Sequence, residues 1–595
     1  MSALRLPGKG EGNRALSDGT PAILDALALA AGQELDRLEK VENRPRHFIF
    51  GLEESSIQDD EAGYAAVFRH CPDQVARSAQ FEDEGSLFKV GEQYVRGSAE
   101  KTSYGLEIFF PAEEMELAGV QPERFREAVA GGVEYVMDTR GLARSLEEFL
   151  IRHQDARNRM VADIAGKKEV REWDSGVPLA DTGGLNPSQN AAVAKALSQR
   201  ALFVWGPPGT GKTRTLAALA ANLLKGGKRV LLTAMSNAAL DNLLDAVAVR
   251  LGDRVRDIGV ARLGKHMDDR VKRFGRDKYN YDDFGAKNMG FDWPIHVRKA
   301  ELVAATFAKL AMRGPDNPRM FDSVIADEVS MANVPNLAVA ACHAEDSMVL
   351  GGDPSQLPPV YSEDVEPNEW FRDSVFDRAG IGDIDDPRVA FLDTQYRMQK
   401  EIGDLVSAAF YKGKLKSEAE VVEPLNGFPA RVLFIDCAGS VEEAHNRTMS
   451  RAQRRFNATH ADAAARAVLR AIEAGVHGAE IGVIVPYNAQ VVCVRSRIDV
   501  VCRDFPREAG RVRVSTIHSF QGQERRVVVA DFTDSEVDPG MLTADRKLIN
   551  VALSRAREAL VMVGNASYLT SPKWFNGGAV EMFKRIIDCS TFWRP

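Results

Sequence analysis

The sequence has few cysteines and no long hydrophobic run. Its six cysteines are scattered over 595 residues, and no two of them form a Cys-x-x-Cys pair. This spacing argues against a zinc knuckle or a disulfide framework and favours a reducing compartment, so we expect a cytoplasmic location. No run of about 18 apolar residues is present, so neither a membrane-spanning helix nor a membrane partner is expected. The first 20 residues lack the apolar core of a secretory signal.

An excess of positive charge is also absent. The net charge of −9 argues against a protein that coats nucleic acid through bulk charge. The charge is uneven, because residues 1–180 hold 22 Lys and Arg against 33 Asp and Glu, a net of −11, which leaves +2 for the rest. The acidic first third could therefore dock a protein partner, and the near-neutral remainder could hold a local basic channel.

The N-terminal region is predicted to hold a small β unit between helices. Residues 1–20 are Gly-rich and polar, which favours a flexible arm, and apolar positions at helical spacing predict a helix over 21–41. Residues 47–110 contain short apolar or alternating runs separated by acidic and Gly-containing loops, a pattern typical of a small antiparallel sheet or barrel. From residue 122 to about 165 the apolar period is helical again, with Val133 among its positions.

Beyond a polar linker at residues 166–185, short β-branched runs alternate with helical patterns. This alternation implies βαβ units and a parallel sheet. About ten such strands suit two α/β domains better than one, because large open sheets rarely exceed about ten strands. Pro and acidic residues cluster between Glu363 and Asp386, where we place the break. The predicted strands are ALFVW, RVLLT, DSVIA, SMVLG and VAFL, then RVLFI, IGVIV, VRVS, RVVVA and ALVMV.

The strongest local signal is a glycine-rich loop between a predicted strand and a predicted helix. Residues 206–213 match the P-loop pattern in full, which disfavours the alternative of a simple turn with a surface lysine. The glycines let backbone N–H groups turn around phosphates, and the helix N-terminus adds partial positive charge. We expect Lys212 to reach the β- and γ-phosphates of ATP, and the Thr213 hydroxyl to bind Mg²⁺. The remaining cradle residues are Gly206, Pro207, Pro208, Gly209, Thr210 and Gly211.

A P-loop needs a carboxylate at the end of a neighbouring strand, and Asp327 and Glu328 follow the apolar run from Phe321. We expect Asp327 to hold the metal and Glu328 to act as the base that orients water. An Asp-Glu pair at a strand end is common and by itself could simply face solvent. Because the same sequence contains a P-loop, the pair is interpreted as the metal ligand and the catalytic base.

Later motifs indicate which P-loop family the sequence is similar to. Gly-Asp-Pro-Ser-Gln-Leu-Pro-Pro begins at 352, Gln-Tyr-Arg-Met at 395, Pro-Tyr-Asn-Ala-Gln at 486, Ser-Phe-Gln-Gly-Gln-Glu at 519 and Asn-Val-Ala-Leu-Ser-Arg-Ala-Arg at 550. In this order and spacing the sequence resembles the superfamily 1B helicases of the nonsense-mediated-decay type, which include the immunoglobulin-mu-binding helicase and senataxin. The resemblance covers about residues 185–566.

The resemblance implies an α/β fold with two tandem RecA-like P-loop domains, parallel sheets, and ATP in the cleft between the domains. The first domain would span 186–375, with a short insertion at about 250–300, and the second 376–595. Residues 21–165 would form an accessory region, in which a small antiparallel β-barrel is carried on stalk helices.

The resemblance also implies the nucleotide contacts. Arg397 and Arg555, both from the second lobe, would reach across the cleft to the γ-phosphate. Either arginine alone would be interpreted as a surface ion pair, but phosphoryl transfer needs charge neutralised from a second element. Arginine suits this need because its planar fork binds phosphate oxygens in two places. The other implied contacts are Gln189 at the adenine edge, Tyr396 stacked near the base, Gln356 at the γ-phosphate and Glu524 near the sugar.

A track for one nucleic-acid strand is implied as well. Small hydroxyl and amide side chains suit backbone contacts, which position a strand without reading its sequence. The competing interpretation of these residues is capping and turn formation. Basic residues between 262 and 278 could add an electrostatic wall or form a solvated helix face. The implied contacts are Ser236, Asn237 and Thr306 in the first lobe, and Pro486, Tyr487, Ser515 and Thr516 in the second.

The sequence therefore predicts an ATP-driven motor that moves 5′ to 3′ on single-stranded DNA or RNA and unwinds duplexes. Two alternatives remain. A nucleic-acid-dependent clamp or switch within a larger assembly would hydrolyse ATP without unwinding. A ring-forming remodeller of proteins could share the P-loop, but its module has no place for the motifs at 395 and 550.

Overall fold

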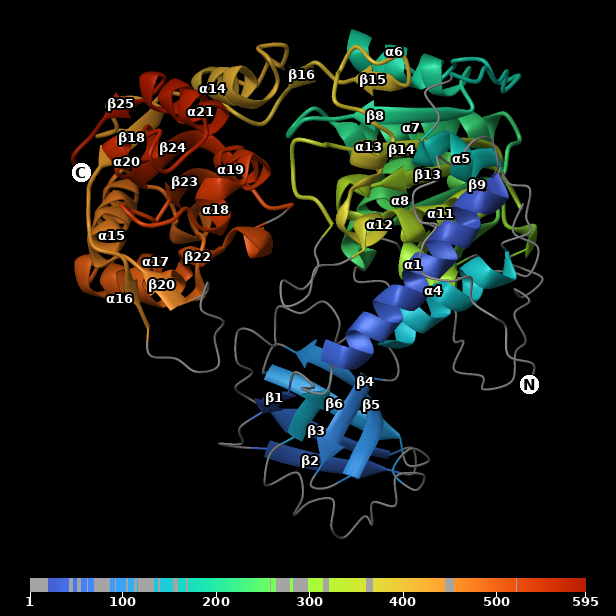
Figure 1. Ribbon diagram of the computed structural model, residues 1–595, viewed down its shortest axis with the longest axis horizontal. Helices are drawn as coiled ribbons and strands as arrows, with labels where there is room; N and C mark the ends of the chain where they lie inside the picture. The colour runs from blue at the N-terminus through green and yellow to red at the C-terminus, as the bar shows by residue number, and fades with distance from the viewer. Residues whose placement is uncertain are drawn as a thin grey trace.

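The computed structural model has two α/β lobes and a small antiparallel sheet (Figure 1). No helix among the residues that the structure describes combines the length and apolarity needed to cross a bilayer. The described residues are 20–41, 47–50, 55–60, 63–68, 86–90, 93–102, 105–111, 115, 133–136, 140–153, 159–166, 170–256, 258–263, 279–281, 298–313, 320–359, 368–444, 454–520 and 522–595.

The first lobe is built on an eight-stranded sheet of order β11-β10-β12-β9-β13-β14-β8-β15, with every pairing parallel. Helices cover both faces, so central strands such as β9 are buried along their whole length and their sequence is continuously apolar. The strands are β8 (Ala201–Trp205), β9 (Val230–Ala234), β10 (Val260–Arg262), β11 (Tyr279–Tyr281), β12 (Leu302–Thr306), β13 (Phe321–Asp327), β14 (Ala344–Gly352) and β15 (Val389–Phe391). The helices are α6 (Pro187–Ala196), α7 (Lys212–Lys225), α8 (Asn237–Leu251), α10 (Phe307–Arg313), α11 (Val334–Cys342), α12 (Glu369–Arg372) and α13 (Val375–Arg378).

The first sheet extends farther along the chain than the predicted break between Glu363 and Asp386. β15 pairs in parallel with β8, next to the P-loop strand, so the first sheet includes residues 389–391. The connection to the second lobe then passes through β16 (Thr394–Gln395), which pairs with β17 (Lys416–Ser417). The Gln-Tyr-Arg-Met motif therefore lies where the chain leaves the first sheet.

The second lobe has a six-stranded parallel sheet of order β22-β21-β23-β24-β18-β25. All ten predicted strands are thus confirmed, and they divide between two parallel sheets as expected. The strands are β18 (Val432–Asp436), β21 (Ile481–Val485), β22 (Arg513–Thr516), β23 (Arg525–Asp531), β24 (Ala556–Gly564) and β25 (Thr591–Phe592), with a separate pair β19 (Glu442–Glu443) and β20 (Arg455–Phe456). The helices are α14 (Lys400–Phe410), α15 (Ala458–Glu473), α16 (Asn488–Val501), α17 (Pro506–Arg511), α18 (Met541–Ala544), α19 (Arg546–Leu553), α20 (Ala566–Leu569) and α21 (Gly577–Asp588).

The N-terminal strands form a seven-stranded antiparallel sheet of order β1-β7-β4-β5-β6-β3-β2. Val133 begins β7, so its helical prediction is wrong: the residue pairs with Phe50 of β1 and Val90 of β4. The strands are β1 (His47–Phe50), β2 (Ser55–Asp60), β3 (Gly63–Phe68), β4 (Ser86–Val90), β5 (Gln93–Thr102), β6 (Gly105–Pro111) and β7 (Val133–Val136). Apart from Thr20, the predicted arm at residues 1–20 lies outside the described residues.

Helices α1 (Thr20–Val41) and α4 (Arg140–Arg152) run side by side between this sheet and the first lobe (Figure 1). Together with α5 (Arg159–Ala165) they pack against α11. Leu27 of α1 and Phe149 of α4 belong to the same buried apolar cluster as Leu337 of α11. The two helices therefore share a hydrophobic core with the first lobe.

Candidate nucleotide and nucleic-acid site

The P-loop connects β8 to α7 and needs glycine at several positions. Gly209 and Gly211 have φ of 76° and 74°, in the left-handed region that residues with a Cβ rarely adopt. A Cβ at Gly206 would lie 2.8 Å from Cβ of Lys212, and one at Gly209 would lie 2.6 Å from Cβ of Arg397. The glycines thus let the loop fold over its own lysine and against the Gln-Tyr-Arg-Met segment.

Lys212 is held by the two carboxylates predicted to work with it. Its Nζ donates to Asp327 Oδ1 and, at 2.9 Å, to Glu328 Oε1. Burial alone would lower the pKa of Lys212, but the attraction of Asp327 and Glu328 overcomes that effect and raises it well above its usual value. The Thr213 hydroxyl donates to Asp327 Oδ2 at 2.8 Å. Glu328 has φ of 55° and a side chain that is 44% exposed, so it projects from a strained turn into the open part of the site.

Gln189 and Tyr396 flank the loop from different segments. Gln189 forms a capping box with Asn186 at the start of α6, and its Nε2 donates to the Thr210 carbonyl at 2.9 Å. Both ends of this buried amide are therefore engaged, and Gln189 holds the P-loop in place. Tyr396 is 43% exposed; its backbone N–H donates to Gly209 O at 3.0 Å, and its hydroxyl accepts from Asn186 Nδ2 at 3.0 Å. An exposed ring beside the loop is placed to stack on a base.

The second lobe contributes the two predicted arginines. Arg555 is buried, and its guanidinium donates to Gln356 Oε1 at 3.0 Å across the seam between the lobes. Burial, followed by the charge of Arg397, lowers the pKa of Arg555 to about 10, so the group stays cationic at neutral pH. Arg397 Nε lies 2.5 Å from Glu524 Oε2. Glu524 thus balances the arginines, since Arg557 lies 3.8 Å from its other oxygen.

Comparison with known proteins agrees with this geometry. Two family models match the chain, and each is described as an AAA domain. One matches residues 184–283 and 292–363, and the other matches residues 371–567. The chain is 27% identical to the regulator of nonsense transcripts 1 of Dictyostelium discoideum over 66% of its own length and 31% of the relative's. It is 28% identical to the DNA-binding protein SMUBP-2 of Mesocricetus auratus over 64% of its length and 42% of the relative's. The chain belongs to the superfamily 1 helicases of this type.

The chain spans less than half the length of these curated relatives. Among solved structures, the chain is similar to the arterivirus nonstructural protein 10, a helicase. The match covers 90% of this chain and 78% of the arterivirus chain, with 13% sequence identity and a TM-score of 0.36.

In the first lobe, the predicted strand contacts lie at the carboxyl ends of β9 and β12. Ser236 is exposed and caps α8 by accepting from Ala239 N at 3.2 Å. Thr306 is partly exposed, and its hydroxyl accepts from Lys309 N at 3.3 Å. Asn237 accepts from the Arg262 guanidinium at 2.8 Å. Ser236 and Thr306 therefore cap backbone N–H groups and also have surface that a strand could contact.

Arg262 departs from the predicted electrostatic wall. Its side chain is fully buried and pairs with Asp241 at 2.9 Å, as well as with Asn237. A buried guanidinium cannot form a solvated basic surface; instead it fixes the first turn of α8, where Ser236 and Asn237 lie. Residues 264–278, which carry the other basic side chains of this stretch, lie outside the described residues.

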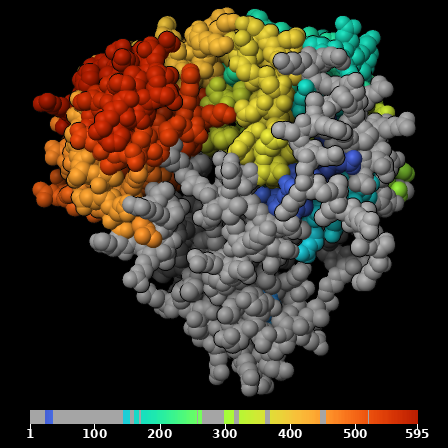
Figure 2. Space-filling model, viewed as in Figure 1, coloured from blue at the N-terminus to red at the C-terminus, as the bar shows by residue number. Residues whose placement is uncertain are grey.

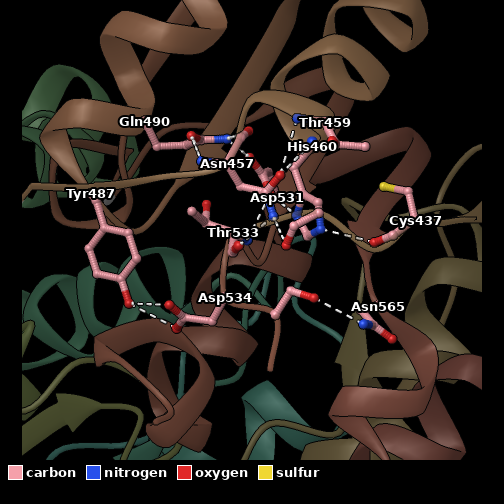
Figure 3. Close-up of polar contacts among 12 residues, drawn as sticks. Cys437, Asn457, Thr459, His460, Tyr487, Gln490, Asp531, Thr533, Asp534 and Asn565 are labelled. Carbon is pink, nitrogen blue, oxygen red and sulfur yellow. Dashed lines mark hydrogen bonds and ion pairs between the residues drawn. The ribbon is translucent and has the colours of Figure 1, made fainter. Parts of the chain in front are cut away.

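In the second lobe, most predicted strand contacts are buried. Pro486 and Ser515 are buried, and Tyr487 is 2% exposed, whereas Thr516 is partly exposed. The Tyr487 hydroxyl donates to the Asp534 carboxylate at 2.8–2.9 Å (Figure 3). A side chain without exposed surface cannot touch a strand in this conformation. These residues are buried because they lie at the carboxyl ends of β21 and β22, where the Tyr487 side chain bonds to Asp534 inside the lobe.

A buried polar network that the sequence analysis did not predict lies at the ends of β23 and β18. Asp531, at the end of β23, contacts His460 Nδ1 at 3.0 Å, Gln490 Nε2 at 2.5 Å and the backbone N–H of Thr533 at 2.7 Å (Figure 3). His460 Nε2 lies 3.0 Å from the Cys437 carbonyl beyond β18. The network therefore ties α15 and α16 to β23 and β18, and holds the segment that carries Tyr487. A lone His and a lone Asp have no recognisable spacing in the sequence.

Proposed function

We propose that this helicase is an ATP-dependent motor that moves 5′ to 3′ along single-stranded DNA or RNA and unwinds duplexes. One observation carries the proposal: Arg555 of the second lobe donates to Gln356 of the first, beside the Lys212–Asp327–Glu328 cluster. Phosphoryl transfer depends on fixed charges around the phosphates, and an arginine from a second lobe makes that charge depend on lobe closure. The relatives' names, which refer to nonsense transcripts and to DNA binding, support nucleic acid as the substrate.

The residues fit ATP with Mg²⁺. Lys212 is a fixed cation at a glycine loop that opens a helix, an arrangement that suits phosphate oxygens. The Thr213 hydroxyl and the Asp327 carboxylate lie 2.8 Å apart, and both are oxygen donors of the kind Mg²⁺ binds. Magnesium bound there would neutralise charge on the transferred phosphate. In this proposal Lys212 binds the β- and γ-phosphates, Glu328 orients the attacking water, and Gln356, Arg397 and Arg555 stabilise the γ-phosphate.

Movement is proposed to follow from closing and reopening the lobes with an alternating grip on the strand. The first lobe, from residue 186 to the end of β15, would grip through Ser236, Asn237 and Thr306. The second lobe, from β16 onward, would grip through Thr516 and backbone of the buried segments. We propose that the antiparallel sheet on α1 and α4 is the family's accessory barrel, that the acidic first third docks a protein partner, and that the helicase works in the cytoplasm.

The proposal is tested by an ATPase titration with matched single-stranded DNA and RNA across salt concentrations, paired with strand displacement from a 5′-overhang duplex. Stimulation by either strand together with displacement supports a motor, and the salt slope reports the phosphates contacted. Stimulation without displacement would indicate the clamp or switch instead. Indifference to both nucleic acids would contradict the proposal and favour a remodeller of proteins.

The catalytic assignment predicts that Lys212→Ala and Glu328→Gln abolish turnover. Glu328→Gln should still bind ATP, because it keeps the shape of the side chain and leaves Lys212 in place. Lys400→Ala is the control, since that lysine is 74% exposed on α14 and pairs with Asp404. Fluorescent-nucleotide binding and phosphate release separate the two steps. Robust stimulated hydrolysis by the Glu328→Gln protein would remove Glu328 from its role.

A further inference from the structure

A buried carboxylate, Asp353, lies at the seam between the lobes. It follows β14 and is 3% exposed. It accepts hydrogen bonds from Trp205 Nε1 at 2.9 Å, from Ser355 N at 3.0 Å and from Gln356 Nε2 at 2.7 Å. Burial raises the pKa of Asp353, and these hydrogen bonds oppose that rise. The carboxylate thus accepts from Ser355 and Gln356 of its own turn and from Trp205 of β8.

The second lobe reaches this carboxylate through Tyr411, which directly follows α14. The Tyr411 hydroxyl donates to Asp353 Oδ2 at 2.5 Å, and burial raises the pKa of the phenol far above its ordinary value, so the proton stays in place. Asn550 of α19 donates to the Tyr411 hydroxyl and to the Ser355 carbonyl, both at 2.8 Å. Figure 2 shows the two lobes, orange-red and yellow-green, in contact along this face of the molecule.

These contacts fix which way the Gln356 amide points. A carboxylate only accepts and a guanidinium only donates. Because Gln356 Nε2 is held by Asp353, its Oε1 faces Arg555, which donates to it at 3.0 Å. Turning the amide over would place two donors against each other at Arg555. Asp353 therefore aligns Gln356 with Arg555, and Tyr411 is the residue of the second lobe that engages Asp353.

We propose that Tyr411 is a positioning residue for ATP hydrolysis, which engages Asp353 when the lobes close and so aligns Gln356 with Arg555. The proposal rests on the proposed function above. Tyr411 touches neither the P-loop lysine nor its carboxylates in the described contacts, so it acts on turnover rather than on binding of ATP. Asn550 supports Tyr411 from the same helix that leads to Arg555.

The test is Tyr411→Phe, assayed by steady-state ATPase with saturating single-stranded nucleic acid. Loss of a buried hydrogen bond to a charged group should lower kcat by about tenfold to a hundredfold, while KM for ATP changes by less than about twofold. Tyr568→Phe is the matched control: it removes another buried hydroxyl, which donates to the Val537 carbonyl at 2.7 Å in the second lobe, and should leave kcat unchanged. An unchanged kcat in Tyr411→Phe overturns the proposal.

A double-mutant cycle separates positioning from general damage. If Tyr411 acts through Gln356, adding Tyr411→Phe to Gln356→Ala should lower kcat no further. Fully additive losses would show that Tyr411 only supports the fold. Should Tyr411→Phe be poorly soluble, Asn550→Ala gives the same readout. Its Oδ1 is buried without a hydrogen-bond partner among the described residues, so truncation leaves no lost acceptor contact. Absence of ATPase activity in the unmodified protein would instead refute the proposed function, which keeps the two failures distinct.

Discussion

At the scale of single residues, the site depends on positions where only one side chain fits. Gly209 combines a left-handed backbone with backbone contact to the Gln-Tyr-Arg-Met segment, so it is fixed by conformation and by space together. Arg555 is fixed by burial and by its contact with Gln356. Each of these two residues adopts a conformation or makes a contact that other residue types cannot reproduce.

Gly209→Ala should abolish ATP binding, because its Cβ would lie 2.6 Å from Cβ of Arg397 and would push the second-lobe segment off the P-loop. Gly227→Ala is the matched control, with φ of 77° and nothing within 4 Å of the added carbon. Both substitutions should lower the free energy of unfolding by roughly 1–2 kcal/mol, from the left-handed backbone alone. Calorimetric titration with ATP distinguishes them, and equal ATP affinities would refute the steric account.

Arg555→Lys should lower stimulated ATPase activity by about a thousandfold or more, although it preserves charge. The planar guanidinium donates to Gln356 and to the Val551 carbonyl at once, and a lysine cannot reproduce that geometry. Single-turnover hydrolysis measures the effect apart from product release. Near-normal turnover by the lysine variant would mean that only the charge matters.

At the scale of elements, the first turn of α8 is held by a buried ion pair rather than by surface charge. Arg262 of β10 contacts both Asn237 and Asp241 of α8. The turn that presents Ser236 is therefore positioned by a neighbouring strand. In the second lobe the Asp531 network performs a comparable task for the strand ends.

Arg262→Met should lower the free energy of unfolding by about 3–5 kcal/mol, because it removes the buried guanidinium that pairs with the Asp241 carboxylate. The double variant Arg262→Met with Asp241→Leu should regain most of that loss, since an apolar pair of similar volume replaces the ions. Urea denaturation measures both. The affinity for a labelled single strand should stay reduced in the double variant, because Asn237 has lost the donor that positions it. Full recovery of this affinity would show that the first turn of α8 does not contribute to strand binding.

At the scale of the whole molecule, helices α1 and α4, called the stalk below, are part of the first lobe's core. Phe149 of α4 is buried in the cluster that includes α11, and its ring centroid lies 4.4 Å from that of His153 and 5.8 Å from that of His343. Movement of α1 and α4 relative to the first lobe would expose this cluster to water. The stalk and the first lobe should therefore move and unfold as one unit.

Phe149→Ala should lower the free energy of unfolding of the first lobe by about 3–5 kcal/mol. Ile151 lies two residues farther along the same helix and is 48% exposed. Ile151→Ala should therefore change the free energy of unfolding by less than about 0.5 kcal/mol. Guanidinium unfolding, followed by the fluorescence of Trp205 and Trp370 in a variant without other tryptophans, reports on this lobe. An equally small effect of both substitutions would show the stalk to be an independent unit.

The sequence alone determined the elements whose signals are local. Apolar runs between helical patterns predicted ten of the fourteen strands that the structure describes in the two parallel sheets, because strands buried on both faces leave few polar positions. The P-loop and the Asp-Glu pair were predictable because glycine conformation and carboxylate placement depend on short spacings. The sequence analysis missed β10, β11 and β25 and misassigned β7 at Val133, because runs of two to four residues look alike in helix and strand. It also missed β12, although that apolar run is as long as β8.

The directions in which polar side chains point follow from how the sheets and lobes pack, and no local pattern predicted them. Tyr487 and Ser515 stand in motifs that suggested surface contacts, yet their strands end inside the second lobe, and Arg262 turned inward to Asp241. Tyr411 carried no signal, because its partner Asp353 lies 58 residues away in the other lobe. A buried polar group must find its partner in space, and that partner is set by how sheets and lobes pack rather than by distance along the chain.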